Sequence, residues 1–238
     1  MILKVRENKM KTKKSLISTI VFFALFIIFT ILVSFVNVEA IGPEGSEVGF
    51  ATLNGAVFNA LGSNEIIYSV TELLGFIPLL LAGCFAIFGI RQAIKRKNPL
   101  KVDIEIIILG AFYVAVLAFY IAFEIITINY RPILIDGVLE ASYPSSHTML
   151  ATCFMTTAIF EFHRLLKGKK ALLIVIDVIF ASIAALIVIG RLLAGVHWLT
   201  DIIAGLLLSG ALISLYCLAV AVAKEKIAKN TEKENAND

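Results

Sequence analysis

Charged residues are scarce in this sequence. Only 16% of its 238 residues are Asp, Glu, Lys or Arg, whereas 59% are hydrophobic, and the mean hydropathy is +0.93. A soluble domain normally contains about 45–50% apolar and about 25% charged residues, and one core of this size could not bury so many apolar side chains. This excludes an ordinary soluble globule. It also excludes a disordered chain, which needs the opposite composition.

Cysteine is rare as well. The three cysteines, Cys84, Cys153 and Cys217, lie in separate apolar runs with neither a pairing pattern nor metal-ligand spacing. We therefore expect small buried side chains rather than a disulfide framework. Internal repeats and low-complexity segments do not stand out. The net charge of +3 is too small to indicate nucleic acid as a partner.

Long apolar stretches, in contrast, cover most of the chain. Six of them lie at about 15–38, 66–90, 104–126, 147–162, 171–190 and 198–222. A spanning helix needs about 20 mostly apolar residues (about 17–25), and five of the six satisfy this directly. The fourth is short, but it begins at the polar Ser145-Ser146-His147, so we expect its first turn to lie in a pocket rather than in lipid. The sequence predicts an all-α, integral-membrane bundle of six transmembrane helices in a single domain over 1–238, with its core at about 66–222.

The first apolar stretch permits two interpretations, a signal peptide or a membrane anchor. Val38-Glu39-Ala40 resembles a cleavage site. The run 16–36, however, is longer than the core of about 7–15 residues in a typical signal peptide. The sequence therefore favours a retained anchor.

The basic residues set the expected orientation. Nineteen of the 21 lie in four clusters, at 4–14, 91–101, 164–170 and 224–233, which fall on alternate ends of six successive helices. Basic residues concentrate in cytoplasmic loops. Both termini are therefore predicted to be cytoplasmic, with tails at 1–14 and 224–238.

The opposite side carries the segments at about 39–65, 127–146 and 191–197. Within the first, Phe50–Leu61 is expected to form a short amphipathic helix along the membrane surface. The other two contain the two remaining basic residues, Arg131 and Arg191. Because topology does not explain positive charge on this side, these arginines indicate a negatively charged partner.

Polar residues on this side form short groups that together suit a phosphate site. The groups are Tyr130-Arg131-Pro132, Tyr143-Pro144-Ser145-Ser146-His147, Gly190-Arg191 and His197-Trp198-Leu199-Thr200-Asp201. Each arginine offers a planar fork of donors that matches phosphate oxygens. Ser145 or Ser146 could cap a helix whose free N–H groups form an anion site. His197 and Asp201, spaced i and i+4, are expected on one helix face, where the carboxylate would orient the imidazole, and His147 is left as the complementary acid.

Each feature alone also has a structural interpretation. A boundary histidine or arginine is often an interfacial side chain, and an i, i+4 His/Asp pair is as often structural as functional. Their occurrence together on one side favours a functional site. His163, among the cytoplasmic basic residues, is expected to have no chemical role. Asp177, alone in the fifth stretch, is expected to make a hydrogen bond between helices.

These groups resemble the signature of the type 2 phosphatidic acid phosphatase (PAP2) superfamily of membrane phosphatases. That signature is Lys-x6-Arg-Pro, then Pro-Ser-Gly-His, then Ser-Arg-x5-His-x3-Asp. The matching positions are Arg131, Pro132, Pro144, Ser145, His147, Arg191, His197 and Asp201. The resemblance implies a PAP2-like fold and a metal-independent reaction without a cofactor, in which His197 is the nucleophile that becomes a phosphohistidine. It further implies that Asp201 raises the basicity of His197 and that His147 protonates the leaving group. The arginines and Ser145, with Ser146 beside it, would bind the phosphoryl oxygens.

Three positions depart from the family signature. Ser146 and Gly190 replace a glycine and a serine, which are small-for-small changes, whereas Glu124 replaces the lysine. Two helical turns would place Glu124 on the same side as Arg131, about 10 Å away, where an ionised carboxylate would repel phosphate. Three interpretations stay open: pairing with Arg131 through water, contact with a substrate hydroxyl, or a weak or inactive phosphatase.

The resemblance implies a multi-pass enzyme of the cell membrane with its active site on the extracytoplasmic face. The expected substrate is a phosphomonoester or pyrophosphate on a lipid, namely phosphatidic acid, phosphatidylglycerol phosphate or undecaprenyl pyrophosphate. Membrane lipids are the other expected partners. The sequence does not rank these three lipids and does not predict an oligomeric state. The alternative is a non-catalytic lipid-phosphate binder or transporter that retains the phosphate site.

Overall fold

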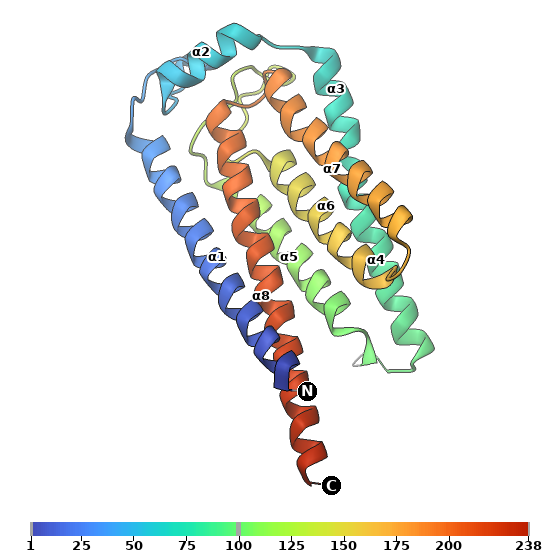
Figure 1. Cartoon of the computed structure of the whole chain (residues 1–238). Helices are drawn as coiled ribbons and strands as arrows, with labels where there is room; N and C mark the ends of the chain where they lie inside the picture. Colours follow the sequence, from blue (N-terminus) through green and yellow to red (C-terminus); the bar gives the residue numbers. More distant parts are fainter. Residues whose placement is uncertain (1, 99–100, 238) are drawn as a thin grey trace.

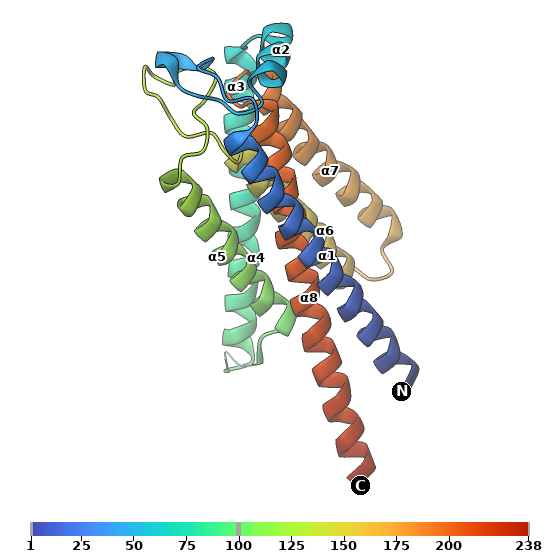
Figure 2. The same cartoon turned by 90° about the vertical axis from the view of Figure 1, so that its left-hand side faces the viewer.

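A computed structural model describes residues 2–98 and 101–237 of the chain, and its architecture is all-helical (Figure 1). The elements are α1 (Ile2–Phe35), η1 (Pro43–Gly45), α2 (Ala51–Leu61), α3 (Glu65–Leu74), α4 (Phe76–Lys95), α5 (Ile104–Ile125), α6 (Ser146–Leu165), α7 (Lys170–Leu193) and α8 (Leu199–Asn237). Both termini lie at one end of the bundle, and α2 lies across the other (Figures 1 and 2). The segments expected as tails are helical continuations of α1 and α8. The side chains of Lys4, Arg6 and Lys233 lie outside the described residues.

Five helical segments in the described part of the chain are long and apolar enough to cross a membrane. They are Glu7–Phe35, Glu65–Lys95, Ile104–Ile125, Lys170–Leu193 and Leu199–Glu232. The expected fourth span, α6, is not one of them. It packs against α4, α5, α7 and α8 and buries Thr148, Thr157 and Glu161. A helix surrounded by protein does not need an apolar surface toward lipid, and the sixth span remains a prediction.

The second apolar stretch is interrupted at Gly75, between α3 and α4. Pro78 follows three residues later and explains the interruption. Its nitrogen cannot donate to the carbonyl of Leu74, and its ring clashes with that carbonyl in a regular helix. The short helix α3 therefore lies beside α7, near the end of the bundle opposite the termini (Figure 1).

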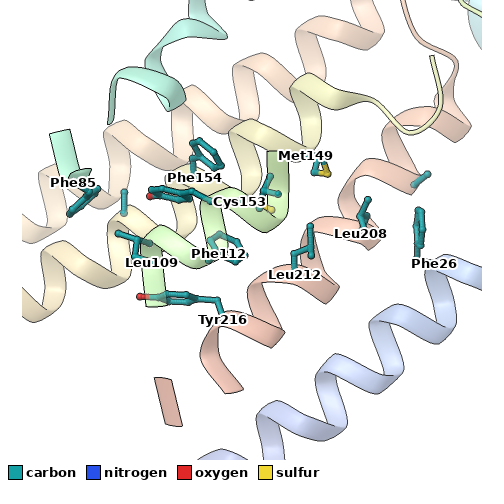
Figure 3. Packing of buried hydrophobic residues seen from close by; sticks show 14 of the residues in the cluster. Phe26, Phe85, Leu109, Phe112, Met149, Cys153, Phe154, Leu208, Leu212 and Tyr216 are labelled. Atoms are coloured by element: carbon teal, nitrogen blue, oxygen red, sulfur yellow. The ribbon is translucent and has the colours of Figure 1, made fainter. Parts of the chain in front are cut away.

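A buried apolar core joins α5, α6 and α8 in the middle of the bundle (Figure 3). The rings of Tyr113 and Phe154 lie with their centroids 4.2 Å apart, and those of Phe112 and Tyr216 lie 5.3 Å apart. On the outer side of α8, Gly210 makes room for α1, because a Cβ there would lie 2.7 Å from the ring of Phe22. This packing fixes α6 relative to α8, and the first turns of these two helices carry most of the predicted site.

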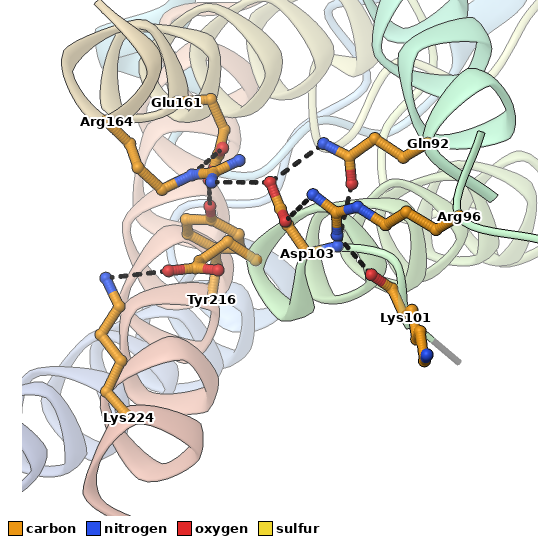
Figure 4. A network of polar contacts seen from close by, with 9 residues as sticks. Gln92, Arg96, Lys101, Asp103, Glu161, Arg164, Tyr216 and Lys224 are labelled. Carbon is orange, nitrogen blue, oxygen red and sulfur yellow. Dashed lines mark hydrogen bonds and ion pairs between the residues drawn. The ribbon is translucent and has the colours of Figure 1, made fainter. Parts of the chain in front are cut away.

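A cluster of polar side chains lies between the helices toward the end of the bundle that carries the termini (Figure 4). The buried carboxylate of Glu161 accepts hydrogen bonds from Tyr216 Oη at 2.7 Å and from Arg164 Nε at 2.7 Å. Arg164 also donates to Asp103 at 3.2 Å, and Asp103 pairs with Arg96 at 2.8 Å. Two residues from the predicted cytoplasmic basic clusters therefore also tie helices together.

A His–Asp pair links α6 to α7 near the same end. Nε2 of His163 lies 2.9 Å from both carboxylate oxygens of Asp177. The interhelical bond expected for Asp177 is therefore present, and it gives His163 a structural contact. Both side chains are partly exposed, at 49% and 38%.

We expect Tyr216→Phe to destabilise the bundle without affecting the opposite end. The variant removes a hydroxyl donor and leaves a buried carboxylate oxygen without that hydrogen bond, a loss of about 1–3 kcal/mol. Thermal unfolding in detergent should show a lower midpoint than in wild type. The control Tyr120→Phe, at a partly exposed position on α5, should leave the midpoint unchanged, and equal midpoints for all three proteins would contradict this role of Tyr216.

Candidate active site

The polar groups predicted from the sequence meet at the end of the bundle opposite the termini. Ser145 N, before α6, donates to the carbonyl of Asp201 in the first turn of α8 at 3.0 Å. Trp198 Nε1 donates to the carbonyl of Tyr130 at 2.7 Å. These bonds connect the starts of α6 and α8 to the segment after α5, so residues up to 68 positions apart in the sequence form one site.

The start of α6 has the capping expected from the sequence. Ser145 is the N-cap residue, and its buried Oγ accepts from the backbone N–H of Thr148 at 3.4 Å. Ser146, the first residue of the helix, lines the adjacent cavity instead. Ser145 thus shapes the helix terminus, and Ser146 is the serine side chain that faces the cavity beside the free N–H groups of the first turn.

The start of α8 differs from the expectation. The helix begins at Leu199, so His197 precedes it and does not share a helical face with Asp201. Asp201 Oδ2 accepts from the backbone N–H of Trp198 at 2.9 Å, which is the capping-box contact of an acidic residue in the first turn. The same oxygen lies 3.7 Å from Nδ1 of His197. The carboxylate is therefore near the imidazole at ion-pair distance, longer than a hydrogen bond.

His197 is nearly completely buried, with 3% of its surface exposed. Burial lowers its pKa well below the ordinary value, and the positive charges of Arg131, Arg191 and His147 lower the pKa further. A depressed pKa keeps the ring neutral at neutral pH, and a neutral ring nitrogen has the lone pair that a nucleophile needs. These interactions also place the four groups within electrostatic range of one another.

Arg191, at the end of α7, is completely buried and is held from α3. Its Nη1 donates to Oε2 of Glu72 at 2.8 Å, and its guanidinium lies over the ring of Tyr68, 5.1 Å from the centroid. The same Oε2 lies 3.5 Å from Nε2 of His147. Sequence reasoning missed Glu72, although an acidic residue inside an apolar stretch was the signal that singled out Asp177.

Two glycines permit the close packing of α3 against the site. A Cβ on Gly190 would lie 2.4 Å from Cγ2 of Thr71, and a Cβ on Gly75 would lie 2.8 Å from Cδ2 of His147. Gly190 stands where the family signature has serine, and the methyl group of Thr71 occupies the adjacent space. The substitution therefore has a local structural reason.

Arg131 lies in the segment between α5 and α6 and faces the same region. Its backbone N–H donates to the carbonyl of Glu140 at 3.0 Å, and its Nε lies 3.0 Å from Oε2 of the same residue. Because α5 ends at Ile125, Arg131 is not on the helix of Glu124, and the expected separation of two helical turns does not apply. Among the described residues, the ion-pair partner of Arg131 is Glu140 rather than Glu124.

A cavity of about 640 Å³ lies beside Arg131 and His147. Its polar lining residues are Glu72, Glu124, Arg131, Glu140, Ser146 and His147, and its apolar lining residues include Phe76, Pro78, Leu79, Leu117 and Leu150. His197 and Arg191 do not line this cavity; His197 lines a small neighbouring hollow together with Glu124 and Ser146. Leu79 and Leu117 are 41% and 38% exposed.

The part of the chain that the structure describes contains no group of three or more His, Cys, Asp or Glu residues that could hold a metal ion. The site instead combines two arginines, two histidines and several carboxylates. Positive charge held near a buried neutral imidazole can bind an anion and offer it a nucleophile.

Comparison with solved structures gives a likeness in fold. The crystal structure of a transmembrane PAP2-type phosphatidylglycerolphosphate phosphatase from Bacillus subtilis matches with a TM-score of 0.55 and 20% sequence identity, covering 84% of this chain and 94% of that one. A comparison with curated proteins gives no match. The PAP2 superfamily model matches residues 15–225, which is most of the chain, and this span contains every residue of the site described above. The chain is therefore a member of the PAP2 superfamily of multi-pass membrane proteins.

Proposed function

We propose that this protein is a membrane phosphatase that hydrolyses a phosphate ester or pyrophosphate of a lipid through a phosphohistidine. The observation that carries the proposal is the cavity itself. Arg131 and His147 line it together with the apolar side chains of Leu79 and Leu117, and both leucines are also partly exposed. An amphipathic lipid suits this mixed lining, with its phosphate beside Arg131 and its apolar part beside the leucines.

In the first step, His197 attacks phosphorus. Its Nδ1 faces Asp201, which leaves Nε2 as the attacking atom. The new P–N bond forms while the P–O bond to the leaving group breaks, and His147 gives its Nε2 proton to the leaving oxygen. Arg131, Arg191 and the free N–H groups at Ser146 stabilise the charge that develops on the phosphoryl oxygens.

In the second step, water hydrolyses the phosphohistidine. His147, now neutral, accepts a proton from the attacking water, and the water oxygen forms the new bond to phosphorus. The P–N bond breaks, which restores His197 and releases inorganic phosphate. The negative charge of Asp201 favours the positively charged ring during both steps.

The substrate class follows from the cavity and from the family. Phosphatidic acid, phosphatidylglycerol phosphate and undecaprenyl pyrophosphate all carry a terminal phosphate on a lipid. Phosphatidylglycerol phosphate comes first among them, because the solved relative in fold is described as a phosphatidylglycerolphosphate phosphatase. We place the site on the extracytoplasmic face, because the termini with their basic residues lie at the other end of the bundle.

We expect purified protein in nanodiscs to release phosphate from at least one of these three lipids in buffer containing a metal chelator. Phosphate release is measured for each lipid with and without added Mg²⁺. Dependence on Mg²⁺ would contradict the mechanism, since both steps use only water and groups of this chain. Binding of lipid phosphate without any release would instead support a lipid-phosphate binder or transporter.

A further inference from the structure

We infer that Glu72 of α3 is a positioning residue that holds His147 in a fixed position relative to Arg191. The inference rests on the proposed function, because it assigns Glu72 a part in the same site. Glu72 lies outside the three sequence motifs of the family signature. The structure brings it into the site by packing α3 against α6 and α7.

The first argument is geometric. One oxygen of Glu72 accepts from Arg191 Nη1 at 2.8 Å and lies 3.5 Å from His147 Nε2. In the proposed reaction, Arg191 binds a phosphoryl oxygen and His147 Nε2 protonates the leaving oxygen. These two tasks act on neighbouring atoms of one substrate. A single carboxylate that contacts both donors fixes the distance between them.

The second argument concerns charge. The charged or titratable groups around His147 come from α3, α5, the segment after α5, α7 and the segment before α8; they are Tyr68, Glu72, Tyr120, Glu124, Tyr130, Arg131, Glu140, Arg191 and His197. Arg131 and Arg191 oppose a positive charge on His147. Among the described residues, Glu72 is the carboxylate within ion-pair distance of His147. It therefore offsets the repulsion of His147 by the two arginines and holds the ring in place.

The third argument is the rigidity of the support. Gly75 allows the backbone at the end of α3 to contact the ring of His147, and Gly190 allows Thr71 to contact α7. Thr71, Glu72 and Gly75 lie within four residues, so the same short stretch contacts three positions of the site. This arrangement limits the movement of the carboxylate relative to both of its partners.

The test compares E72A, which lacks the carboxylate, with E72Q, which keeps an oxygen that can accept from both donors. Misalignment of a catalytic group by about 1 Å can lower a rate by about 10²-fold. We therefore expect kcat on a lipid phosphate to fall by about 10²-fold in E72A with little change of KM, and to fall much less on nitrophenyl phosphate, whose leaving group needs no proton. E72Q should stay closer to wild type on both substrates.

Two further variants sharpen this test. E72D keeps a carboxylate at this position and should retain more of the wild-type kcat than E72A. E65Q is the matched control, because Glu65 is exposed in the first turn of the same helix and outside the cavity. It should behave as wild type. Kinetics are measured on the full chain in nanodiscs with phosphatidylglycerol phosphate and with phosphatidic acid.

A spectroscopic readout separates failure of this inference from failure of the proposed function. The chain has three histidines, and imidazole ¹⁵N signals report on the contacts of each ring without any turnover. The signal that disappears in His147→Gln belongs to His147. At a fixed pH this signal should differ between wild type and E72A and should be unchanged in E65Q.

The outcomes are distinct. A wild-type protein that releases no phosphate from any lipid contradicts the proposed function, while the ¹⁵N signal of His147 still tests Glu72. An unchanged His147 signal in E72A overturns the inference. Equal losses of kcat on the lipid phosphate and on nitrophenyl phosphate also overturn it, because Glu72 would then only support the fold. A lower KM in E72A with an unchanged kcat overturns it as well, because Glu72 would then only compete with the substrate phosphate.

Discussion

His197→Ala is expected to abolish phosphate release from the lipid that the wild-type protein hydrolyses. In the proposed mechanism the P–N bond to this residue is the only covalent intermediate, and alanine cannot form it. Removal of a catalytic nucleophile lowers kcat by about 10⁴- to 10⁶-fold. The depressed pKa of His197, caused by burial and by the positive charges around it, also predicts that wild-type activity persists at mildly acidic pH, because the nucleophile remains neutral there.

The measurement is phosphate release combined with trapping of the phosphohistidine. Wild type quenched during turnover of ³²P-labelled lipid should contain acid-labile, base-stable phosphate, and His197→Ala should contain none. His163→Ala is the matched control, because it removes a histidine that pairs with Asp177 toward the opposite end of the bundle. Equal rates in wild type and His197→Ala would eliminate the phosphohistidine mechanism.

His147→Ala is expected to give a large loss that depends on the leaving group. A positioned general acid contributes about 10²- to 10⁴-fold, and an alkoxide leaving from a lipid phosphate needs its proton. Nitrophenolate leaves without protonation. We therefore expect a kcat lower by about 10²–10⁴-fold on the lipid phosphate but within about ten-fold of wild type on nitrophenyl phosphate.

The ratio of the two losses is the informative quantity. Similar losses on both substrates would show that His147 binds phosphate or supports the fold rather than protonating the leaving oxygen. His163→Ala again serves as the control and should change neither rate. Size-exclusion profiles in detergent establish that each variant retains the wild-type fold.

Hydrophobic patterning was sufficient to predict the helices. Each of the six apolar stretches corresponds to α1, α3 with α4, α5, α6, α7 or α8, because a long apolar run in a membrane protein has few alternatives to a helix. The polar start at Ser145 likewise predicted the N-cap of α6. Both features are determined by residues that lie close together in the sequence, so one sequence is enough to predict them.

The errors arose where the geometry depends on distant parts of the chain. The i, i+4 spacing of His197 and Asp201 suggested one helical face, but the helix begins at Leu199. Glu124 was expected two turns from Arg131, but α5 ends before Arg131 and a loop carboxylate takes its place.

Glu72 was missed for the same reason. It lies 119 positions before Arg191, and its contact arises only from the packing of α3 beside α7. The spacing of residues within a short motif gives no information about a contact between segments so far apart in the sequence.

The helix α8 is long enough to place the C-terminal end of the chain far from the proposed active site at its start. Its 39 residues correspond to about 58 Å at 1.5 Å per residue, whereas a bilayer with its headgroups is about 40–45 Å thick. One continuous helix therefore starts beside the proposed nucleophile and is longer than a bilayer with its headgroups by about two to three turns. A fluorophore or affinity tag attached after its last turn would stand tens of ångströms from the catalytic cavity, where it can immobilise or report on the protein without obstructing lipid entry.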